Sequence, residues 1–284
     1  MIPMSAAAVL PAGSLYARMA NLRILAVGTP SQMSEGTAKQ CSAIILAAGV
    51  GRRLGEPGGL PKVLLKVGGR TLLDRHLDIL TSLGIEDIAL TVGYQAEAIR
   101  AEVARLGLES RVNVVVNERY REGSMLSLWL QSGRLRSGRP VVLMDGDVLY
   151  DWRMIARLQE EPGEAILLVD REIEPGDEPV KICFRDGIIV DFRKQPAYAS
   201  DWHGESVGFF RFSPRMAEAL AERCNNYIEH GACSLEYEEA IRDLILREPA
   251  LFRAADISDL PWTEIDFQED IARARDVIWG KLIS

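Results

Sequence analysis

The sequence predicts an α/β fold with a mixed, mainly parallel sheet and an antiparallel excursion in the C-terminal half. After residue 41, apolar runs of strand length alternate with segments of helical period, and the short crossovers between them favour a parallel sheet with helices on both faces. Farther along, strand-like runs follow one another closely. A chain of 284 residues with 48% hydrophobic content can bury a full core, and we interpret residues 41–284 as one domain.

The first half predicts alternating strands and helices. A buried strand at 43–47 is followed by a helix at 71–83, whose leucines recur on one face and which ends before Gly84. The remaining elements are predicted as strands at 88–92, 112–116 and 141–144 and helices at 95–106 and 124–135.

The second half predicts the antiparallel excursion. The segment Arg185-Asp-Gly-Ile188 fits a tight hairpin turn with a glycine where φ is positive. The predicted strands lie at 165–169, 180–184, 188–192 and 206–212, and the predicted helices at 214–223, 235–246 and 267–279.

Composition excludes several classes of protein. A net charge of −8 argues against broad binding to nucleic acid, and no apolar run is long enough for a membrane span. The four cysteines lack the spacing of a zinc site or a disulfide scaffold, which favours a reducing cytoplasm. We interpret residues 1–40 as a poorly ordered N-terminal extension rather than a signal peptide, because no basic residue precedes their apolar run. The sequence is compatible with a homo-oligomer.

A loop rich in glycine and arginine follows the first strand. Gly49 and Gly51 let the backbone approach a ligand and present N–H groups to phosphate oxygens. The dinucleotide fingerprint fails because Leu54 occupies the place of its third glycine, and no G-x-x-x-x-G-K-[ST] loop is present. These residues alone leave open a glycine-rich turn with solvated arginines.

The longer pattern resembles a known signature. Leu46-Ala-Ala-Gly-Val-Gly-Arg-Arg-Leu-Gly55 followed by Leu60-Pro-Lys-Val-Leu64 is similar to the L-A-A-G-x-G-x-R and P-K-x-L motifs of the nucleotidylyltransferase (NTP transferase) superfamily. The resemblance implies a Rossmann-like three-layer α/β/α fold and a nucleotidyltransferase activity. It also implies a loop around the nucleotide, formed by Leu46, Ala47, Ala48, Gly49 and Gly51. Arg53 and Lys62 would lie along the triphosphate, where fixed cations stabilise the charge that develops as pyrophosphate leaves.

Acidic residues at a strand end predict a metal site. The strand at 141–144 runs into Asp145 and Asp147 at the carboxyl edge of the sheet, and Mg²⁺ prefers carboxylate and phosphate oxygens. The resemblance assigns Asp147 to the metal and Asp145 to the nucleotide. Alone, D-x-D also fits a solvated turn or the metal motif of nucleotide-sugar glycosyltransferases.

A second acidic motif lies near the C-terminus. In Pro261-Trp-Thr-Glu-Ile-Asp266, the aspartate could simply be the N-cap of the following helix. The segment also resembles the W-x-E-I-D motif of the subgroup that includes phosphocholine cytidylyltransferases. That resemblance makes Asp266 the second metal ligand, with Glu264 beside it.

Weaker similarities suggest further contacts. Gly93 and Tyr94 resemble a family loop near the base, Ser127 matches a family serine at base and acceptor, and Lys194 matches a lysine that reaches the acceptor phosphate. Ser124 stands where related members usually carry asparagine. An ammonium group on the acceptor would favour an aromatic wall and a carboxylate, for which the candidates are Trp129, Trp202, Tyr237, Trp262, Glu205 and Glu238. Each of these aromatics could instead belong to the core or the surface.

These features together predict a Mg²⁺-dependent enzyme that transfers CMP from CTP to a small phosphorylated amino alcohol, phosphocholine or a phosphonate analogue, and releases pyrophosphate. A sugar-1-phosphate or inositol-1-phosphate nucleotidylyltransferase is the alternative within the same chemistry. A GT-A glycosyltransferase that uses a nucleotide-sugar donor is the alternative from another class.

Overall fold

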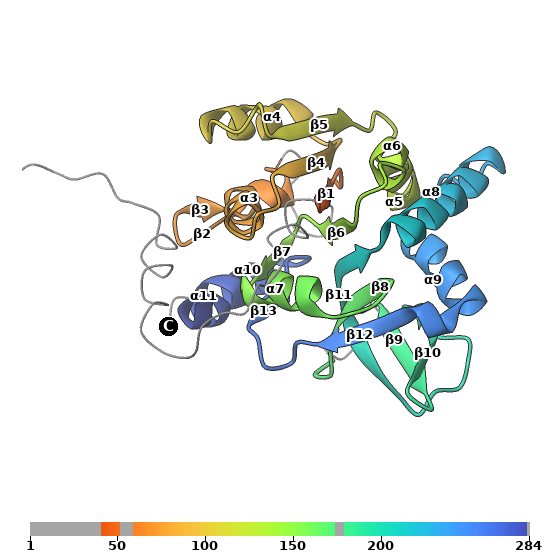
Figure 1. Cartoon of the computed structure of the whole chain (residues 1–284). Helices are drawn as coiled ribbons and strands as arrows, with labels where there is room; N and C mark the ends of the chain where they lie inside the picture. The colour runs from red at the N-terminus through yellow and green to blue at the C-terminus, as the bar shows by residue number, and fades with distance from the viewer. Residues whose placement is uncertain (1–40, 52–58, 174–178, 283–284) are drawn as a thin grey trace, which may run out of the picture. The chain divides into compact units, whose positions relative to one another are not determined.

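The structure is a computed structural model that describes residues 41–51, 59–173 and 179–282, all within the compact unit Gly36–Ser284 (Figure 1). The predicted extension at 1–40 and Arg53 lie outside the described residues. The strands are β1 (Ser42–Ala47), β2 (Lys66–Val67), β3 (Arg70–Thr71), β4 (Asp87–Val92), β5 (Val112–Val116), β6 (Val141–Asp145), β7 (Val148–Tyr150), β8 (Ala165–Asp170), β9 (Lys181–Arg185), β10 (Ile188–Arg193), β11 (Trp202–Phe212), β12 (Phe252–Asp256) and β13 (Trp262–Glu264).

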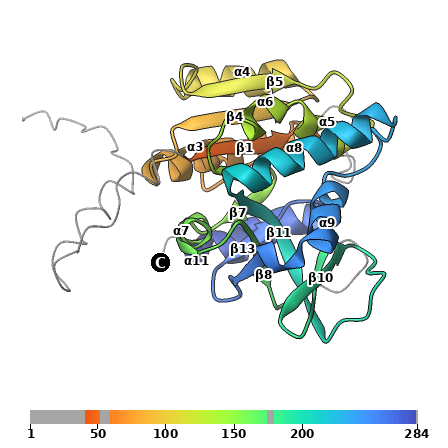
Figure 2. The same ribbon diagram turned by 45° about the vertical axis from the view of Figure 1, so that its right-hand side comes forward.

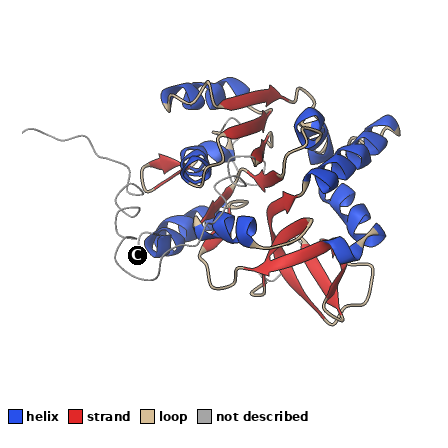
Figure 3. Cartoon of the chain, in the orientation of Figure 1, coloured by secondary structure: helices blue, strands red, loops and turns tan. Residues whose placement is uncertain are grey.

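Helices lie between many of these strands, but β8 to β11 follow one another directly (Figure 3). The helices are α3 (Leu72–Ser82), α4 (Ala96–Arg105), α5 (Ser124–Trp129), α6 (Ser132–Leu135), α7 (Arg153–Glu160), α8 (Pro214–Glu229), α9 (Glu238–Arg247), α10 (Gln268–Arg273) and α11 (Trp279–Leu282). Short 3₁₀ turns lie at η3 (Lys62–Leu64) and η4 (Pro249–Leu251), and a π-helical turn, η5 (Ala274–Ile278), joins α10 to α11. Among the described helices, none combines the length and apolar character that crossing a bilayer requires.

Four parallel strands form the N-terminal part of the main sheet, in the order β6-β1-β4-β5. The chain moves outward from β1 through α3 to β4 and through α4 to β5, and then returns to the other side of β1 as β6. The strand order therefore reverses between β1 and β6, where Leu46 lies opposite Asp145. Ligands of such sheets bind beyond the carboxyl ends of the strands at this reversal.

The long strand β11 connects the parallel strands to the antiparallel excursion. Its residues 209–212 pair with β6, its residues 202–205 pair with β9, and β8 runs along its other edge. The register shifts between these halves around Gly208, whose φ is +77°. The hairpin between β9 and β10 is confirmed, with positive φ at both Asp186 and Gly187.

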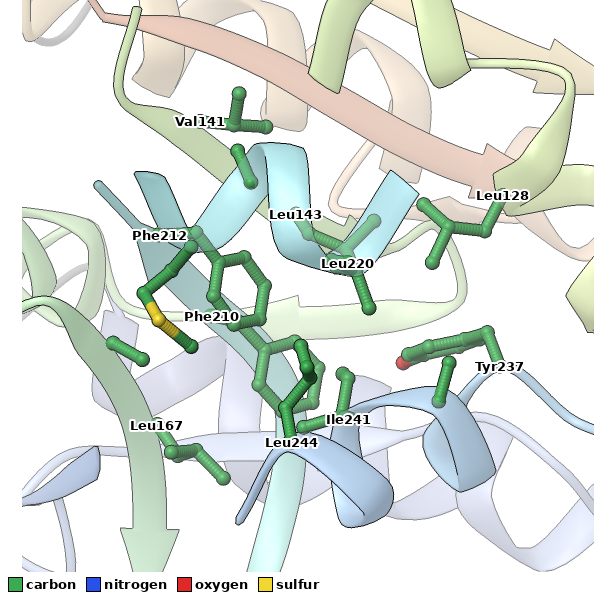
Figure 4. Packing of buried hydrophobic residues seen from close by; sticks show 14 of the residues in the cluster. Leu128, Val141, Leu143, Leu167, Phe210, Phe212, Leu220, Tyr237, Ile241 and Leu244 are labelled. Carbon is green, nitrogen blue, oxygen red and sulfur yellow. The ribbon is translucent and has the colours of Figure 1, made fainter. Parts of the chain in front are cut away.

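The largest described core cluster lies between the sheet and the layer of α5, α6, α8 and α9 (Figures 2 and 4). β1 contributes Ile44 and Leu46 to it, while β11 contributes Phe210 and Phe212. On the opposite face, Phe209 packs edge-on against Tyr150 with ring centroids 4.7 Å apart. Burial of each large apolar side chain stabilises the fold by about 1.5–3 kcal/mol, so both faces hold β1 and β6 firmly in register.

Several boundaries differ from the sequence prediction. The helix expected at 124–135 is divided into α5 and α6 at Leu130 and Gln131, and the buried Gln131 side chain donates a hydrogen bond to the Thr91 hydroxyl. The strand expected from 206 begins at Trp202, since its first residues pair with β9. The sequence did not predict β7, α7, β12 or β13, and the helix expected at 267–279 contains the η5 turn.

Candidate active site

Backbone contacts fix the glycine-rich loop after β1. The Gly146 amide donates to the Leu46 carbonyl at 2.9 Å, and the Tyr94 amide donates to the Ala48 carbonyl at 3.1 Å. A Cβ atom on Gly93 would lie 2.9 Å from the same Ala48 oxygen, so this close approach requires glycine. Gly93 and Tyr94 thus support the loop from behind and are not among the residues that line the cavities described below.

The loop faces open space on its other side. A cavity of about 530 Å³, termed here the loop cavity, lies against Leu46, Ala48 and Gly49. A smaller cavity of about 90 Å³ is lined by Ala47, Gly51 and Lys62 together with Leu46, Gly49, Val63, Gly146 and Asp147. The loop cavity also reaches Lys62, Ser124, Ser127, Asp145, Asp147, Lys194, Tyr237, Glu238, Glu264 and Asp266. The structure therefore brings most of the sequence-predicted residues to one place.

Three carboxylates converge beside the loop. One carboxylate oxygen each from Asp147, Glu264 and Asp266 lies within 4.8 Å of the other two. The short pairing of β7 with β13 produces this arrangement, because Val148 lies opposite Glu264 and the Ile265 amide donates to the Asp147 carbonyl at 3.0 Å. A compact set of carboxylates that lines the loop cavity fits the oxygen ligands that Mg²⁺ takes.

Lys62 joins the loop to this cluster. It begins the η3 turn directly after Pro61, and its Nζ donates to Asp147 Oδ2 at 2.9 Å and to Asp266 Oδ1. Burial alone would lower the pKa of Lys62, but the two carboxylates outweigh it and raise the pKa above its ordinary value. The ammonium group is therefore a fixed positive charge at the carboxylate cluster.

Asp145 lies deeper than Asp147. Burial, followed by the charges of Asp147, Glu238 and Glu264, raises its pKa well above the usual value, and the Tyr237 hydroxyl donates to Asp145 Oδ2 at 2.8 Å. Its other neighbour is Gly208, where a Cβ atom would lie 2.2 Å from the same oxygen. The bulge in β11 therefore leaves room for the Asp145 carboxyl group.

The carboxyl group of Glu264 is crowded although the residue retains contact with solvent. Protein atoms around the group, followed by the charges of Asp147 and Asp266, raise its pKa to about 8. A cation bound at the three carboxylates would favour the charged form of Glu264.

Two buried polar side chains that the sequence analysis missed support the site. His76 of α3 contacts the Gly146 carbonyl through Nε2 at 3.0 Å, and its burial lowers its pKa to about 4, so the neutral ring donates there. Asn117 donates from Nδ2 to Ser127 Oγ at 3.0 Å and thereby orients that hydroxyl. His76 lies on the face of α3 that carries the buried leucines, and Asn117 directly follows the apolar strand β5, which is the signal that the sequence offers.

Ser124 contacts a neighbouring segment. Its hydroxyl donates to Glu236 and accepts from the Tyr237 amide at 2.9 Å, which ties the start of α5 to the start of α9. Ser124 lines the loop cavity.

A second cavity of about 240 Å³, termed here the acidic cavity, opens onto the same carboxylates. Lys194, which directly follows β10, lines both cavities, as do Asp145, Tyr237, Glu238, Glu264 and Asp266. The acidic cavity adds Asp170, Glu172, Pro179, Val180, Glu205, Ser206, Val207, Gly208, Trp262, Thr263, Phe267, Asp270 and Arg273.

Two of the predicted acceptor-site tryptophans lie elsewhere. The indole N–H of Trp129 donates to Asn225 Oδ1 at 3.2 Å, and the ring packs against the core. Trp202 stacks on Phe184 with ring centroids 4.0 Å apart and is covered by the Arg171 guanidinium. Neither lines a cavity at the site within the described part of the chain, whereas Trp262 and Tyr237 do. Trp202 lies away from the cavities because it pairs with Phe184 of β9 in the sheet and its ring stacks on that residue.

Comparison with known proteins identifies relatives of this chain. CMP-5'-(3-aminopropyl)phosphonate synthase of Streptomyces rubellomurinus is 30% identical over 245 residues, which cover 82% of this chain and 38% of that protein. The bifunctional IPC transferase and DIPP synthase of Rubrobacter xylanophilus is 30% identical over 243 residues, which cover 84% of this chain and 52% of that protein. The chain thus spans about two fifths to one half of the length of these relatives.

The fold is shared with solved structures. The structure of CTP:phosphocholine cytidylyltransferase from Streptococcus pneumoniae matches with a TM-score of 0.68 and 21% identity, over 84% of this chain and 99% of that one. The predicted Rossmann-like α/β fold is therefore confirmed. The family model of the MobA-like NTP transferase domain matches residues 43–260, which confirms the resemblance seen in the glycine-rich loop. The chain accordingly belongs to the MobA-like NTP transferase family.

Proposed function

We propose that this chain is a Mg²⁺-dependent cytidylyltransferase that transfers CMP from CTP to a small phosphorylated amino alcohol, phosphocholine or a phosphonate analogue, and releases pyrophosphate. The observation that carries the proposal is the cluster of Asp147, Glu264 and Asp266, held against Lys62 where the loop cavity meets the acidic cavity. The names of the relatives support it, because one is a CMP-aminophosphonate synthase and a protein with the same fold is a CTP:phosphocholine cytidylyltransferase.

The reaction assigns a role to each group. CTP would lie along the glycine-rich loop, and an oxygen of the acceptor would attack the α-phosphorus in line with the departing pyrophosphate. Lys62 would supply a point charge to the triphosphate, and Arg53 a planar fork. Asp147 and Asp266, with Glu264 beside them, would hold a Mg²⁺ ion that neutralises charge on the phosphate oxygens.

The remaining groups position the two substrates. Lys194 faces both cavities and is therefore suited to hold the phosphate or phosphonate of the acceptor next to the nucleotide. The Ser127 hydroxyl already accepts a hydrogen bond from Asn117, so its own O–H can donate to an acceptor atom of the base.

Inositol 1-phosphate is the second candidate acceptor. The observation that favours it is that a protein with the same fold is an inositol-1-phosphate CTP transferase from T. maritima, with a TM-score of 0.66 and 20% identity. Lys62 and the carboxylates would have the same roles in the transfer of CMP. The acidic cavity would bind an inositol ring in place of an amino alcohol.

A substrate panel tests the proposal. Pyrophosphate release is measured with Mg²⁺ and each of CTP, UTP, GTP and ATP against phosphocholine, phosphoethanolamine, 2-aminoethylphosphonate, inositol 1-phosphate and glucose 1-phosphate. Fastest release with CTP and an amino acceptor supports the proposal. Release only with a sugar or inositol phosphate would show that the acceptor is that phosphate and not an amino alcohol phosphate. No release with any pair would contradict nucleotidyl transfer, and nucleotide-sugar donors would then be tested.

Two variants test the metal ligands. Asp147→Asn and Asp266→Asn should each abolish Mg²⁺-dependent turnover while the melting temperature stays near that of the wild type. Asp276→Asn, at an exposed position outside the cavities, is the matched control. Full turnover in either site variant would remove that residue from the metal site.

A further inference from the structure

The segment between β10 and β11 carries Lys194, which lines both the loop cavity and the acidic cavity. This segment, termed here the β10–β11 turn, covers residues 194–201, contains no helix or strand, and is exposed to solvent over residues 194–199. A segment of this kind buries little apolar surface, so a few specific polar contacts determine its position. The place of Lys194 in the cavity wall therefore depends on the contacts that hold the turn.

Asp191 of β10 binds the far end of this turn. Its side chain is completely buried, and its Oδ2 atom accepts hydrogen bonds from the Ala197 amide at 2.7 Å and the Tyr198 amide at 3.3 Å. Its Oδ1 atom accepts from the Phe192 amide at 3.0 Å and from Nε of Arg242 at 2.7 Å. One carboxylate thus joins the end of β10, the β10–β11 turn and α9.

The contact between Asp191 and Arg242 is a buried ion pair. Burial alone would raise the pKa of Asp191, but Arg242 and the amides of the turn outweigh burial and lower the pKa below its ordinary value. The two side chains are 0% and 11% exposed. Because desolvation offsets much of the attraction, such a pair adds little net stability compared with apolar side chains of similar size. The position that the pair imposes on the turn explains its presence better than the stability that it adds.

α9 supports the turn and the cavity wall together. It packs against β10 (Figures 1 and 2). Arg193, next to Lys194, forms a second ion pair with Glu239 at 2.9 Å, and Glu239 lies three residues before Arg242 on the same face of the helix. The first residue of α9, Glu238, lines the same two cavities as Lys194. The two ion pairs thus fix Lys194 relative to the part of the wall that α9 contributes.

We propose that Asp191 and Arg242 are positioning residues, which hold the β10–β11 turn so that Lys194 reaches the phosphate or phosphonate group of the acceptor. This inference rests on the nucleotidyl transfer proposed above and on the role proposed there for Lys194. It applies to every candidate acceptor, because each of them carries a phosphate or phosphonate group. Neither Asp191 nor Arg242 lines the two cavities, so their effect on the acceptor passes through the turn.

A double-mutant cycle tests this inference. At saturating CTP and Mg²⁺, kcat/KM is measured for 2-aminoethylphosphonate, phosphocholine and inositol 1-phosphate with the wild type, Arg242→Ala, Lys194→Met and the double variant. We expect Lys194→Met to lower kcat/KM roughly tenfold to a hundredfold, as loss of a charged hydrogen bond predicts. Arg242→Ala should lower it at least about fivefold in the wild type and less than about twofold in the Lys194→Met background, because residues that act through one another are not additive. The KM for CTP should not change.

Arg223→Ala is the matched control. The Nε atom of Arg223 donates to Asp243 of α9 at 2.6 Å, and its guanidinium lies over the Tyr227 ring much as that of Arg242 lies over the Tyr198 ring. These contacts join α8 to α9 and do not involve the β10–β11 turn. The control should therefore lower the melting temperature and leave kcat/KM per folded molecule unchanged.

The outcomes separate positioning from stability. A lower melting temperature of Arg242→Ala with unchanged kcat/KM per folded molecule would overturn this inference, and so would equal losses in the wild type and in the Lys194→Met background. Both results would leave nucleotidyl transfer intact. If Arg242→Ala does not fold, Ala197→Pro decides by the same criteria, since it removes an amide donor to Asp191 at an exposed position of the turn. No pyrophosphate release by the wild type with any acceptor would overturn both proposals.

Discussion

Replacement of Lys62 by methionine keeps most of the side chain's length and removes its charge. In the wild type, the ammonium group neutralises part of the Asp147, Glu264 and Asp266 cluster, and it lies 2.9 Å from Asp147 Oδ2. Its removal leaves three carboxylates close together without the charge of the Lys62 ammonium group. The same change removes the point charge that we propose for the triphosphate. We therefore expect both the stability of the fold and the rate of catalysis to fall.

The two responses differ in size. Removal of one partner from a buried ion pair costs about 3–5 kcal/mol, and an exposed pair is worth about 1 kcal/mol or less. The Lys62 side chain is 16% exposed, which places the loss between these limits, at about 1–3 kcal/mol without metal. Loss of one preorganised charge-stabilising group typically lowers kcat by roughly 100- to 1000-fold. Mg²⁺ should stabilise the variant more than the wild type, because the ammonium no longer competes for the carboxylates.

Turnover per folded molecule and thermal melting with and without Mg²⁺ measure both effects. Lys66→Met is the matched control, since Lys66 is exposed on β2 and outside the cavities. If Lys62→Met retained turnover within about threefold of the wild type, Lys62 would have no role at the triphosphate, contrary to the expected loss of preorganised charge. A large loss of stability with normal turnover would make the residue purely structural.

Two further predictions concern groups that position Asp145 and Asp147. Gly208→Ala should destabilise the fold by about 1–3 kcal/mol more than Gly231→Ala. Both glycines have a φ of +77°, but only a Cβ atom at position 208 would meet the Asp145 carboxyl group. Equal melting temperatures of the two variants would exclude that contact as a cause of destabilisation. Burial lowers the pKa of His76 from 6.5 to about 4, so the folded chain binds fewer protons between these values, and stability should fall by up to about 3 kcal/mol as pH drops through that window. His76→Gln should flatten this part of the stability profile, and an unchanged slope would assign it to other groups.

Much of the fold could be predicted because its parallel strands are long apolar runs. The strand predicted at 43–47, which is β1 at Ser42–Ala47, and the turn at Asp145 were visible from local sequence, and the glycine-rich signature linked them to nucleotide chemistry. β7 and β13 were not visible, since strands of three residues carry no periodic signal. Yet their pairing brings Asp266 to Asp147, so only the resemblance, and not the local pattern, pointed to the full cluster.

The acceptor side was less predictable. Trp202 and Trp262 both looked suitable, but the pairing of β11 with β9 turns one away while Asp170 holds the other in the cavity wall. His76 was missed because its partner, Gly146, lies 70 residues away in sequence. Asn117 was missed because its contact with Ser127 depends on how α5 packs beside the end of β5. Such contacts depend on which faces meet in the fold, and the chain order does not show them.

We expect the carboxylates and Lys62 to catalyse transfer of the cytidylyl group of CTP to an acceptor. The most direct measurement follows CTP labelled in its α-phosphate with Mg²⁺ and 2-aminoethylphosphonate. We expect the label to appear in an acceptor conjugate in equal amount to the released pyrophosphate, and we expect Asp266→Asn to abolish both products. Label that stays in CTP, or that appears only in free CMP whether or not acceptor is present, would contradict this expectation.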